Sequence, residues 1–537
     1  MILSNGCIYL KIDSKFWVLL MVGIGFCLPG CIPGPVKEYW DHGMKVGPEY
    51  SKPPAPVSID WIDKDDKRIR TDPDEHRNWW KNFNDPNLDE LICFATKQNL
   101  KLKEAGYRVM ASRADLAIAI GQFMPQNQNM GSGFTQYGLS TAVANRNFNN
   151  VDLIPQNYYP QYNFGFNLAW ELDFWGRYRR AIESSSDQLD ASIENYDEVM
   201  VSMLGEIGEH YVLYRYFERL VELYRENIEY QKISLQIAKA KFEGGTTSEL
   251  DFDQAQSDLK YLEASVNVYT RFQRVENNAL CTLLGISPED LGKKMVRKGI
   301  PIPPKDVAVG VPAQLITRRP DVRMAERQAA AQCAKIGVAM SELFPHLYIN
   351  GSFGYNATNN TALFTSPAFY GTIGPGFYWN IFNYGRLLNN VKMQDANFQV
   401  NVAKFQYSLV NAGKEVEDAI VEYVKGAEAI KEMEVSVDAI RRASQIVIVQ
   451  YKAGTTDFNR VSLVQESRIK RESELALYQQ MYARGMVKIY KSLGGGWQVR
   501  LDGCDEGGAI SEQPGELPAP KTEILRPVPE SKPEAPK

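Results

Sequence analysis

The sequence offers little of the material from which most enzymatic and metal sites are built. Its 537 residues contain only four histidines, and none of its seven cysteines stands in a Cys-x-x-Cys pair. Histidine-based acid/base or metal sites are therefore poorly supplied, and the spacings of zinc and thioredoxin-like motifs are missing. We expect no metal and no cofactor.

The chain also lacks any block of charge of one sign. Its 60 basic and 65 acidic residues are mixed along the chain and leave a net charge of −5. Without a basic patch or tail, nothing points to nucleic acid as a partner. A hydrophobic content of 44% is enough for a sizeable core, and the 28 tyrosines suit a membrane-interface belt.

Long apolar runs are absent except near the N-terminus. Residues 16–27 follow Lys11 and Lys15 and are too few to cross a membrane as a helix, which is typical of a signal peptide. The run ends in Leu28-Pro29-Gly30-Cys31, which resembles the bacterial lipobox except at Pro29. Residues 1–30 would then be removed and Cys31 would be acylated. The alternative is ordinary cleavage nearby, which would leave Cys31 as a spare thiol.

After residue 31 no apolar run could form a membrane-spanning helix, so the chain can enter a membrane only as strands that close a barrel. The best candidate strand is 162–172, in which apolar or aromatic residues occupy every even position. Such alternation gives one apolar and one polar face. After Gly176 a charged run without proline begins, which predicts a very long helix.

The chain repeats this arrangement. Trp170 matches Trp379 and Gly176-Arg177 matches Gly385-Arg386 at an offset of 209, whereas Ala114, Pro125 and Gly131 match Ala334, Pro345 and Gly351 at 220. Each half reads helix, strand, loop, strand, very long helix, Gly-Thr-Thr turn and helix. The expected strands are 126–137, 162–172, 346–356 and 378–382. Four strands lose their edges only by joining strands of other subunits.

The predicted domains follow from the repeat. The chain is divided into a lipoprotein signal peptide (1–30), a lipidated extended arm (31–78), a first repeat (79–299), a second repeat (300–500) and a proline-rich disordered tail (501–537). The hairpins are expected at about 124–173 and 345–383, and the turns between long helices at 244–247 and 454–456. The helix before the first hairpin is expected to run from 88 to about 122.

Seven motifs, taken together and in order, resemble one protein family over roughly residues 28–500. They are VGPEYSKP (46–53), WWKNFNDPNLDELI (79–92), WELDFWGRYRRA (170–181), ELDFDQAQSDL (249–259), PAQLITRRPDVRMAE (312–326), TIGPGFYWNIFNYGR (372–386) and IYKSLGGGW (489–497). The family is that of the trimeric outer-membrane efflux lipoproteins, which act with tripartite pumps.

The resemblance implies an α+β membrane protein of the Gram-negative outer membrane. Four strands from each chain of a homotrimer would build a twelve-stranded barrel that continues into an α-helical barrel in the periplasm. Its partners would be a periplasmic adaptor protein, an inner-membrane pump and, through acylated Cys31, outer-membrane lipid. Catalysis is not expected, and small toxic molecules such as drugs, dyes or metals would be exported.

The resemblance also suggests roles for three groups of residues. The two turns would form the periplasmic tip where the adaptor docks: Gly244, Gly245, Thr246, Thr247, Gly454, Thr455 and Thr456. Relatives often carry Leu and Asp in a LxxLDAQ pattern after the second turn, but Asn459 and Leu463 stand there, so Asp251 and Asp253 are candidates to replace the missing carboxylates of the gate. The junction between barrel and tube would comprise Trp170, Gly176, Arg177, Trp379, Gly385 and Arg386.

Two other functions remain open from the sequence. One is a duct of the same architecture for type I protein secretion. The other, of a different class, is a structural periplasmic coiled-coil lipoprotein without a lumen, against which the alternating strands argue.

Overall fold

The computed structural model describes residues 39–54, 56, 58, 60–70, 76–138, 158–296, 299–312 and 318–503. The predicted signal peptide, Cys31 and nearly all of the predicted tail lie outside these residues. The chain divides into two compact units. The first comprises Met1–Pro56, Tyr107–Asn195 and Pro320–Val410, and the second comprises Val57–Gly106, Tyr196–Arg319 and Asn411–Lys537.

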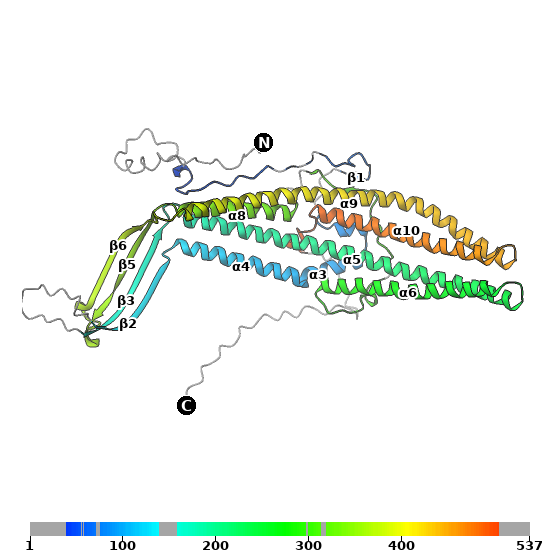
Figure 1. Cartoon of the computed structure of the whole chain (residues 1–537), viewed down its shortest axis with the longest axis horizontal. Helices are drawn as coiled ribbons and strands as arrows, with labels where there is room; N and C mark the ends of the chain where they lie inside the picture. Colours follow the sequence, from blue (N-terminus) through cyan, green and yellow to red (C-terminus); the bar gives the residue numbers. More distant parts are fainter. Residues whose placement is uncertain are drawn as a thin grey trace, which may run out of the picture. The chain divides into compact units, whose positions relative to one another are not determined.

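The first unit contains a four-stranded antiparallel sheet (Figure 1). Its strands are β2 (Asn127–Gly138), β3 (Tyr158–Leu172), β5 (His346–Ala357) and β6 (Phe369–Tyr378), in the order β2-β3-β5-β6. Directly opposite residues place their side chains on the same face of a sheet. Phe166 lies opposite Phe353 with ring centroids 5.2 Å apart, so the apolar positions of neighbouring strands share one face.

The fourth strand differs from the prediction. It occupies Phe369–Tyr378 rather than 378–382, which was expected from its alternation. The reason is the extent of its neighbour: β5 begins at His346, which lies opposite Tyr378. Within the described ranges, residues 379–382 consequently have no strand beside them with which to exchange backbone hydrogen bonds.

Two helices lead to the first strands of the hairpins, α4 (Leu100–Phe123) and α8 (Pro320–Ser341). The helix predicted for 88–122 is broken, because α3 (Pro86–Gln98) ends before Asn99. The Asn99 side chain accepts a hydrogen bond from the backbone N–H of Leu102 at 2.9 Å, which caps the start of α4.

Two helices of 67 residues follow the hairpins, α5 (Arg177–Glu243) and α9 (Arg386–Lys452). Both contribute residues to each compact unit. In the first unit, α8 and α9 share an apolar core built from Ala329, Cys333, Ile336 and Phe398.

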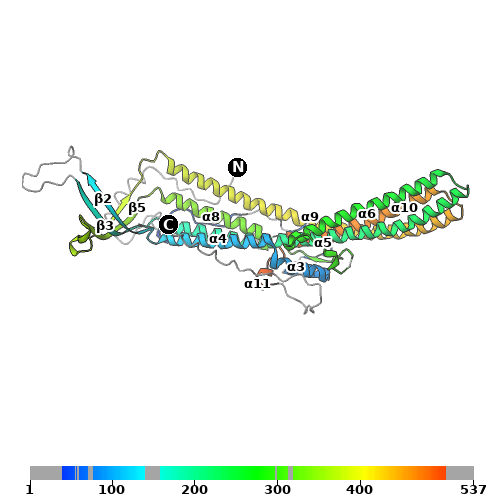
Figure 2. The same ribbon diagram turned by 90° about the horizontal axis from the view of Figure 1, so that it is seen from below.

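The second unit contains α6 (Glu249–Leu284) and α10 (Phe458–Ser492), each joined to a long helix by a short turn. Figure 2 shows α5, α6, α9 and α10 alongside one another. One buried cluster draws residues from all four helices: Ala238, Ala255, Val447, Tyr451, Phe458 and Val461. The remaining short elements are β1 (Ile69–Arg70), β4 (Val307–Ala308), η2 (Trp79–Phe83), η3 (Leu291–Lys293), η5 (Asn360–Ala362), η6 (Ser366–Ala368) and α11 (Val499–Asp502).

None of the helices in the described part of the chain combines the length and the hydropathy that a membrane-spanning helix requires.

Candidate functional site

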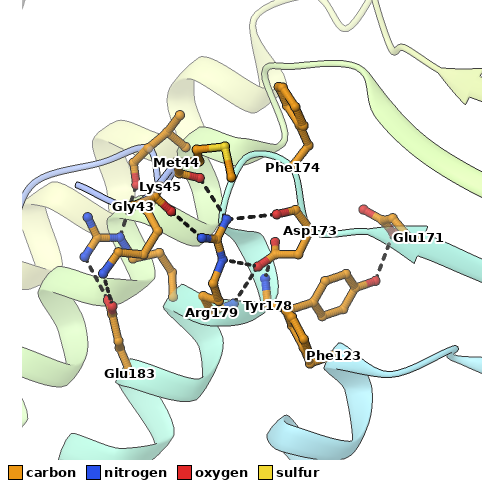
Figure 3. A network of polar contacts seen from close by, with 12 residues as sticks. Gly43, Met44, Lys45, Phe123, Glu171, Asp173, Phe174, Tyr178, Arg179 and Glu183 are labelled. Carbon is orange, nitrogen blue, oxygen red and sulfur yellow. Dashed lines mark hydrogen bonds and ion pairs between the residues drawn. The ribbon is translucent and has the colours of Figure 1, made fainter. Parts of the chain in front are cut away.

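The turn from β3 into α5 is organised by the carboxylate of Asp173 (Figure 3). It accepts hydrogen bonds from the backbone N–H groups of Tyr178 at 3.0 Å and Arg179 at 3.1 Å, which are orphan donors in the first turn of the helix. The Asp173 side chain is only 4% exposed, and Arg179 Nε lies 2.8 Å from it. Asp173 therefore fixes the direction in which the chain leaves the sheet.

Arg179 also joins this turn to the N-terminal arm (Figure 3). Its guanidinium donates to the carbonyl of Met44 at 2.8 Å and to the carbonyl of Gly43. The backbone N–H of Val46, in the arm, donates a hydrogen bond to the carbonyl of Trp175 at 3.0 Å. Gly176 has φ of +79°, and a Cβ there would lie 2.8 Å from Lys45, so glycine allows both the turn and the close approach of the arm.

Further ion pairs hold the arm one turn along α5. The Arg180 side chain is 3% exposed and contacts Glu49 and Glu183, each at 2.8 Å, and Lys45 also pairs with Glu183. Burial alone would raise the pKa of Glu183, but hydrogen bonds from Lys45 and Arg180 hold it below its ordinary value. Glu183 is thus a carboxylate at neutral pH and anchors both cations.

A second charged cluster crosses from β3 to the loop before β5. Arg177 contacts Glu171 at 3.2 Å and Glu342 at 3.0 Å, and His346 Nδ1 lies 2.7 Å from Glu171. The hydrogen bond from His346, together with the charge of Arg177, lowers the pKa of Glu342. The predicted junction residue Arg177 is therefore an ion-pair partner that connects the two hairpins.

The second strand-to-helix junction shares its backbone geometry with the first. Gly385 has the same φ of +79° as Gly176, and each glycine immediately precedes a long helix. The indole of Trp170 donates to the carbonyl of Phe123 at 3.3 Å, and that of Trp379 donates to the carbonyl of Leu343 at 3.0 Å. Arg386 begins α9 and is exposed.

The two turns between long helices have matching hydrogen bonds. Gly245 and Gly454 both have positive φ, as expected where the chain reverses at the end of a helix. Thr246 bonds to the carbonyl of Lys241 through its N–H at 2.9 Å and its hydroxyl at 3.0 Å, and Thr455 makes both bonds to Gln450 at 3.0 Å. Gly244, Thr247 and Thr456 complete these turns.

The two helical hairpins are joined just inside these turns. Lys241 Nζ donates to the carbonyl of Tyr451 at 2.5 Å and lies 4.2 Å from the centroid of the Tyr451 ring. The contact combines a charge-assisted hydrogen bond with a cation–π interaction. It links the end of α5 to the end of α9, so the two turns lie side by side.

A buried carboxylate joins the same helices further along. The Glu472 side chain is 1% exposed and lies 2.7 Å from Arg441 and 3.3 Å from Arg468. Asn227 of α5 donates to it at 3.3 Å. Burial would raise the pKa of Glu472, but these partners lower it below its ordinary value.

The gate candidates lie near the turns. Asn459 and Asp253 are exposed, Leu463 is 55% exposed, and Asp251 is half-buried where it accepts a hydrogen bond from the Thr247 hydroxyl. No group of acidic, histidine or cysteine side chains suited to a metal ion occurs among the described residues.

The contacts of Lys241, Glu472 and the arm were not predicted from the sequence. Apart from the pair of Glu472 with Arg468, which lie four residues apart on α10, these contacts join separate helices or residues more than a hundred positions apart, and no local pattern marks such pairs. Asp173 lies four residues before the start of α5, and it takes over the hydrogen bonds of an N-cap side chain because Gly176, at the flanking position, has none.

Comparison with known proteins decides the family. The family model described as "Outer membrane efflux protein" matches residues 91–286 and 311–495. The chain belongs to the outer membrane efflux protein family. It is therefore an outer-membrane channel protein for efflux, as the motifs predicted.

Members of the outer membrane efflux protein family resemble the chain over most of its length. The toluene efflux pump outer membrane protein TtgF of Pseudomonas putida is 27% identical over 85% of this chain and 94% of its own. The probable outer membrane lipoprotein SilC of Salmonella typhimurium is 24% identical over 89% and 98%. The solved outer-membrane channel OprN is 29% identical, with a TM-score of 0.77 over 84% of this chain and 99% of its own.

Proposed function

We propose that this chain forms the homotrimeric outer-membrane duct of a tripartite efflux system and exports small toxic molecules. The observation that carries the proposal is the sheet, in which β2 and β6 each have one edge without a neighbouring strand among the described residues. Open edges expose backbone N–H and C=O groups that a bilayer cannot satisfy. Three copies would close twelve strands into a barrel that has no edge.

The internal repeat belongs to the same proposal. The 67-residue helices α5 and α9 begin and end 209 positions apart, and each follows a glycine with φ of +79°. The turns after them make the same pair of threonine hydrogen bonds. These matching features support an internal structural repeat in the chain. Three chains with such a repeat would provide six similar segments around a duct.

The proposed partners are a periplasmic adaptor, an inner-membrane pump and membrane lipid. Acylation of Cys31 would anchor the arm, and the contacts of Gly43 and Met44 with Arg179 would hold the arm against the junction. The two turns, paired through Lys241 and Tyr451, offer a single docking surface for the adaptor. The gate would use Asn459, Leu463, Asp251 and Asp253 near that surface.

The exported molecules include drugs, dyes, metals or organic solvents, the last because a relative serves a toluene efflux pump. A deletion strain tests the proposal when it is exposed to toluene, dyes, detergents and metal ions. We expect lower minimal inhibitory concentrations for at least one class, restored by the gene on a plasmid. Unchanged susceptibility to all four would overturn the efflux function.

The two alternatives have their own signatures. A type I secretion duct would leave susceptibility unchanged and would abolish the appearance of a secreted protein in the medium. A structural coiled-coil lipoprotein would dissolve without detergent and would show no shift in gel mobility on heating, whereas a trimeric β-barrel shows such a shift.

A further inference from the structure

The seam between the two hairpins of one chain provides a template for the contact between copies. We call this seam, in which β3 pairs with β5, the inner seam. It aligns eleven residue pairs, from Tyr162 opposite Ala357 to Leu172 opposite Leu347. The outer edges, β6 on one side and β2 on the other, are the counterparts of β3 and β5 in the repeat.

The structure fixes the equivalence of the strands residue by residue. The hairpin pair Asn127–Ala169 corresponds to the hairpin pair His346–Tyr378, because each opens its hairpin nearest the helices. This equivalence shifts the second strand of the hairpin by 209 positions and the first strand by 219. The helices before the first strands, α4 and α8, instead begin 220 positions apart, so the second half has one residue fewer between the start of the helix and the start of the strand.

The faces of the sheet confirm the shorter shift. Opposite pairs put even residues of β2 and β3 on the same face as odd residues of β5 and β6, as Phe134–Tyr162 and Phe166–Phe353 illustrate. A shift of 219 matches the apolar face of β2 with the apolar face of β5, so that Phe134 corresponds to Phe353. A shift of 220 would exchange the two faces, because side chains alternate along a strand. The sequence match of Gly131 with Gly351 is therefore replaced by Gly131 with Asn350.

We infer that β6 of one copy pairs antiparallel with β2 of the next copy, in the register of the inner seam. The inference rests on the proposed trimer and gives it a residue-level interface. The inner pair Gly165–Gly354 becomes Gly374 opposite Thr135 of the next copy. The outermost pairs become Gly371 opposite Gly138 and Ile381 opposite Gln128 of the next copy.

This register explains why the fourth strand was predicted at 378–382 although β6 occupies Phe369–Tyr378. The alternation of residues 378–382 predicts a strand, yet β6 ends at Tyr378 because β5 offers no partner beyond it. In the inferred seam, β2 of the next copy lies opposite the chain as far as Ile381. The alternation of residues 378–382 thus predicts a strand that pairs only in the assembled sheet and not within the single chain.

A side chain at the corner of the seam fits the same arrangement. At the inner seam, the Trp175 ring stacks on Phe344 at 4.5 Å, and its indole N–H donates to the carbonyl of Pro345 at 2.8 Å. The counterpart of Trp175 is Tyr384, which is 100% exposed and has φ of +51°. Before the first strand the shift is 220, as the match of Pro125 with Pro345 shows, so the partners of Tyr384 would be Met124 and Pro125 of the next copy, and Met124 is also exposed.

Cysteine pairs across the seam test the register in the full-length protein. Directly opposite positions have Cβ atoms close enough for a disulfide, and a Cβ at Gly374 meets no atom within 4 Å. We expect the double variant Thr135→Cys/Gly374→Cys to yield covalent dimers and trimers after mild oxidation, on gels run without reductant. The double variant Ser132→Cys/Phe377→Cys tests the opposite face in the same way.

The matched control is Phe134→Cys/Gly374→Cys, whose first cysteine is one residue away and on the other face. It should give at most a tenth of the cross-linked product, and Gly374→Cys alone supplies the background from native cysteines. More product from the control than from Thr135→Cys/Gly374→Cys would overturn the register. Native mass spectrometry distinguishes failure of this register from failure of the proposed trimer. A trimer that forms neither cross-link overturns the register alone. A monomer in detergent overturns the proposed trimer as well.

Discussion

The indole of Trp379 donates a hydrogen bond to the carbonyl of Leu343 at 3.0 Å. The indole of Trp170 makes the corresponding bond to Phe123 at 3.3 Å. Trp170 lies in β3 and Phe123 ends α4, whereas Trp379 directly follows β6 and Leu343 lies two residues beyond the end of α8. The base of each hairpin is therefore closed in the same way in both halves of the chain.

The first prediction concerns this closure. Trp379→Phe keeps an aromatic ring and removes the donor, and we expect it to lower the free energy of unfolding by about 1 kcal/mol. Denaturant titration of the detergent-solubilised protein measures this change. Trp170→Phe should give a similar loss, and equal stability of both variants and wild type would show that the bonds contribute nothing.

The second prediction concerns the arm. Arg179→Gln removes the donors that bind Asp173 and the carbonyls of Gly43 and Met44. The change leaves the nearly buried carboxylate of Asp173 without its guanidinium partner, so the arm should loosen around Gly43 and Met44, although Arg180 still holds Glu49. Limited trypsin digestion should then cut at Lys45 at least ten times faster than in wild type.

The control for the arm experiment is Arg327→Gln, which removes an exposed arginine whose contact with Asp187 is long, at 3.4 Å. Its digestion rate should match that of wild type. Equal digestion of the two variants would contradict the role of Arg179 as the tie between arm and junction.

The third prediction concerns Glu472 and pH. Because its pKa in the folded protein lies below the ordinary value, the carboxylate stabilises the fold above about pH 4.5 and loses this effect as the pH falls through the lowered value. Glu472→Gln leaves Arg441 and Arg468 without their shared anion, so we expect a loss of about 3 kcal/mol at pH 7. The loss should shrink towards pH 3.

Thermal unfolding at pH 7 and at pH 3 measures this dependence. The control is Glu466→Gln, on the exposed side of α10, which should change stability by less than about 0.5 kcal/mol. A loss for Glu472→Gln that is the same at both pH values would refute the electrostatic explanation.

The fourth prediction concerns Tyr384 at the contact between copies. Tyr384→Ala should lower the temperature at which trimers dissociate on a gel, because it removes a ring that packs on Met124 of the next copy. Tyr384→Phe retains the ring and should keep the dissociation temperature of wild type. If the alanine variant dissociates at the wild-type temperature, Tyr384 does not lie in the interface.

The fifth prediction concerns the gate. Asp251→Ala together with Asp253→Ala removes the carboxylates proposed to replace the Asp of the LxxLDAQ pattern, which this chain lacks after the second turn. We expect lower cation selectivity and weaker block by multivalent cations in planar bilayers. Asp258→Ala, whose carboxylate is occupied by the Ser462 hydroxyl at 2.7 Å, serves as the control. Unchanged selectivity in the double variant would exclude these acids from gating.

Much of the fold could be predicted because its signals are local. Alternation over 162–172 gave β3, and the absence of proline after Gly176 gave the start of α5 to within one residue. The glycines of the turns could be placed for the same reason, since a positive φ favours glycine wherever it occurs. The family motifs then supplied the family, the efflux function and the outer-membrane location.

The rest could not be predicted because it depends on residues distant in sequence. The end of β6 at Tyr378 depends on where β5 begins, and the offset of 219 between β2 and β5 emerges only from strand pairing. The contacts of Arg179 with Gly43 and Met44 cross about 135 positions, and composition alone does not reveal such a partner.

The edges of β2 and β6 that have no neighbouring strand in the described part of the chain have a consequence for biogenesis. A subunit that has folded but not met its neighbours carries two rows of backbone groups that hydrocarbon cannot solvate. In water the same edges are templates for mispairing and aggregation. For the proposed trimer, insertion into the membrane and assembly of the three chains would therefore have to be coupled.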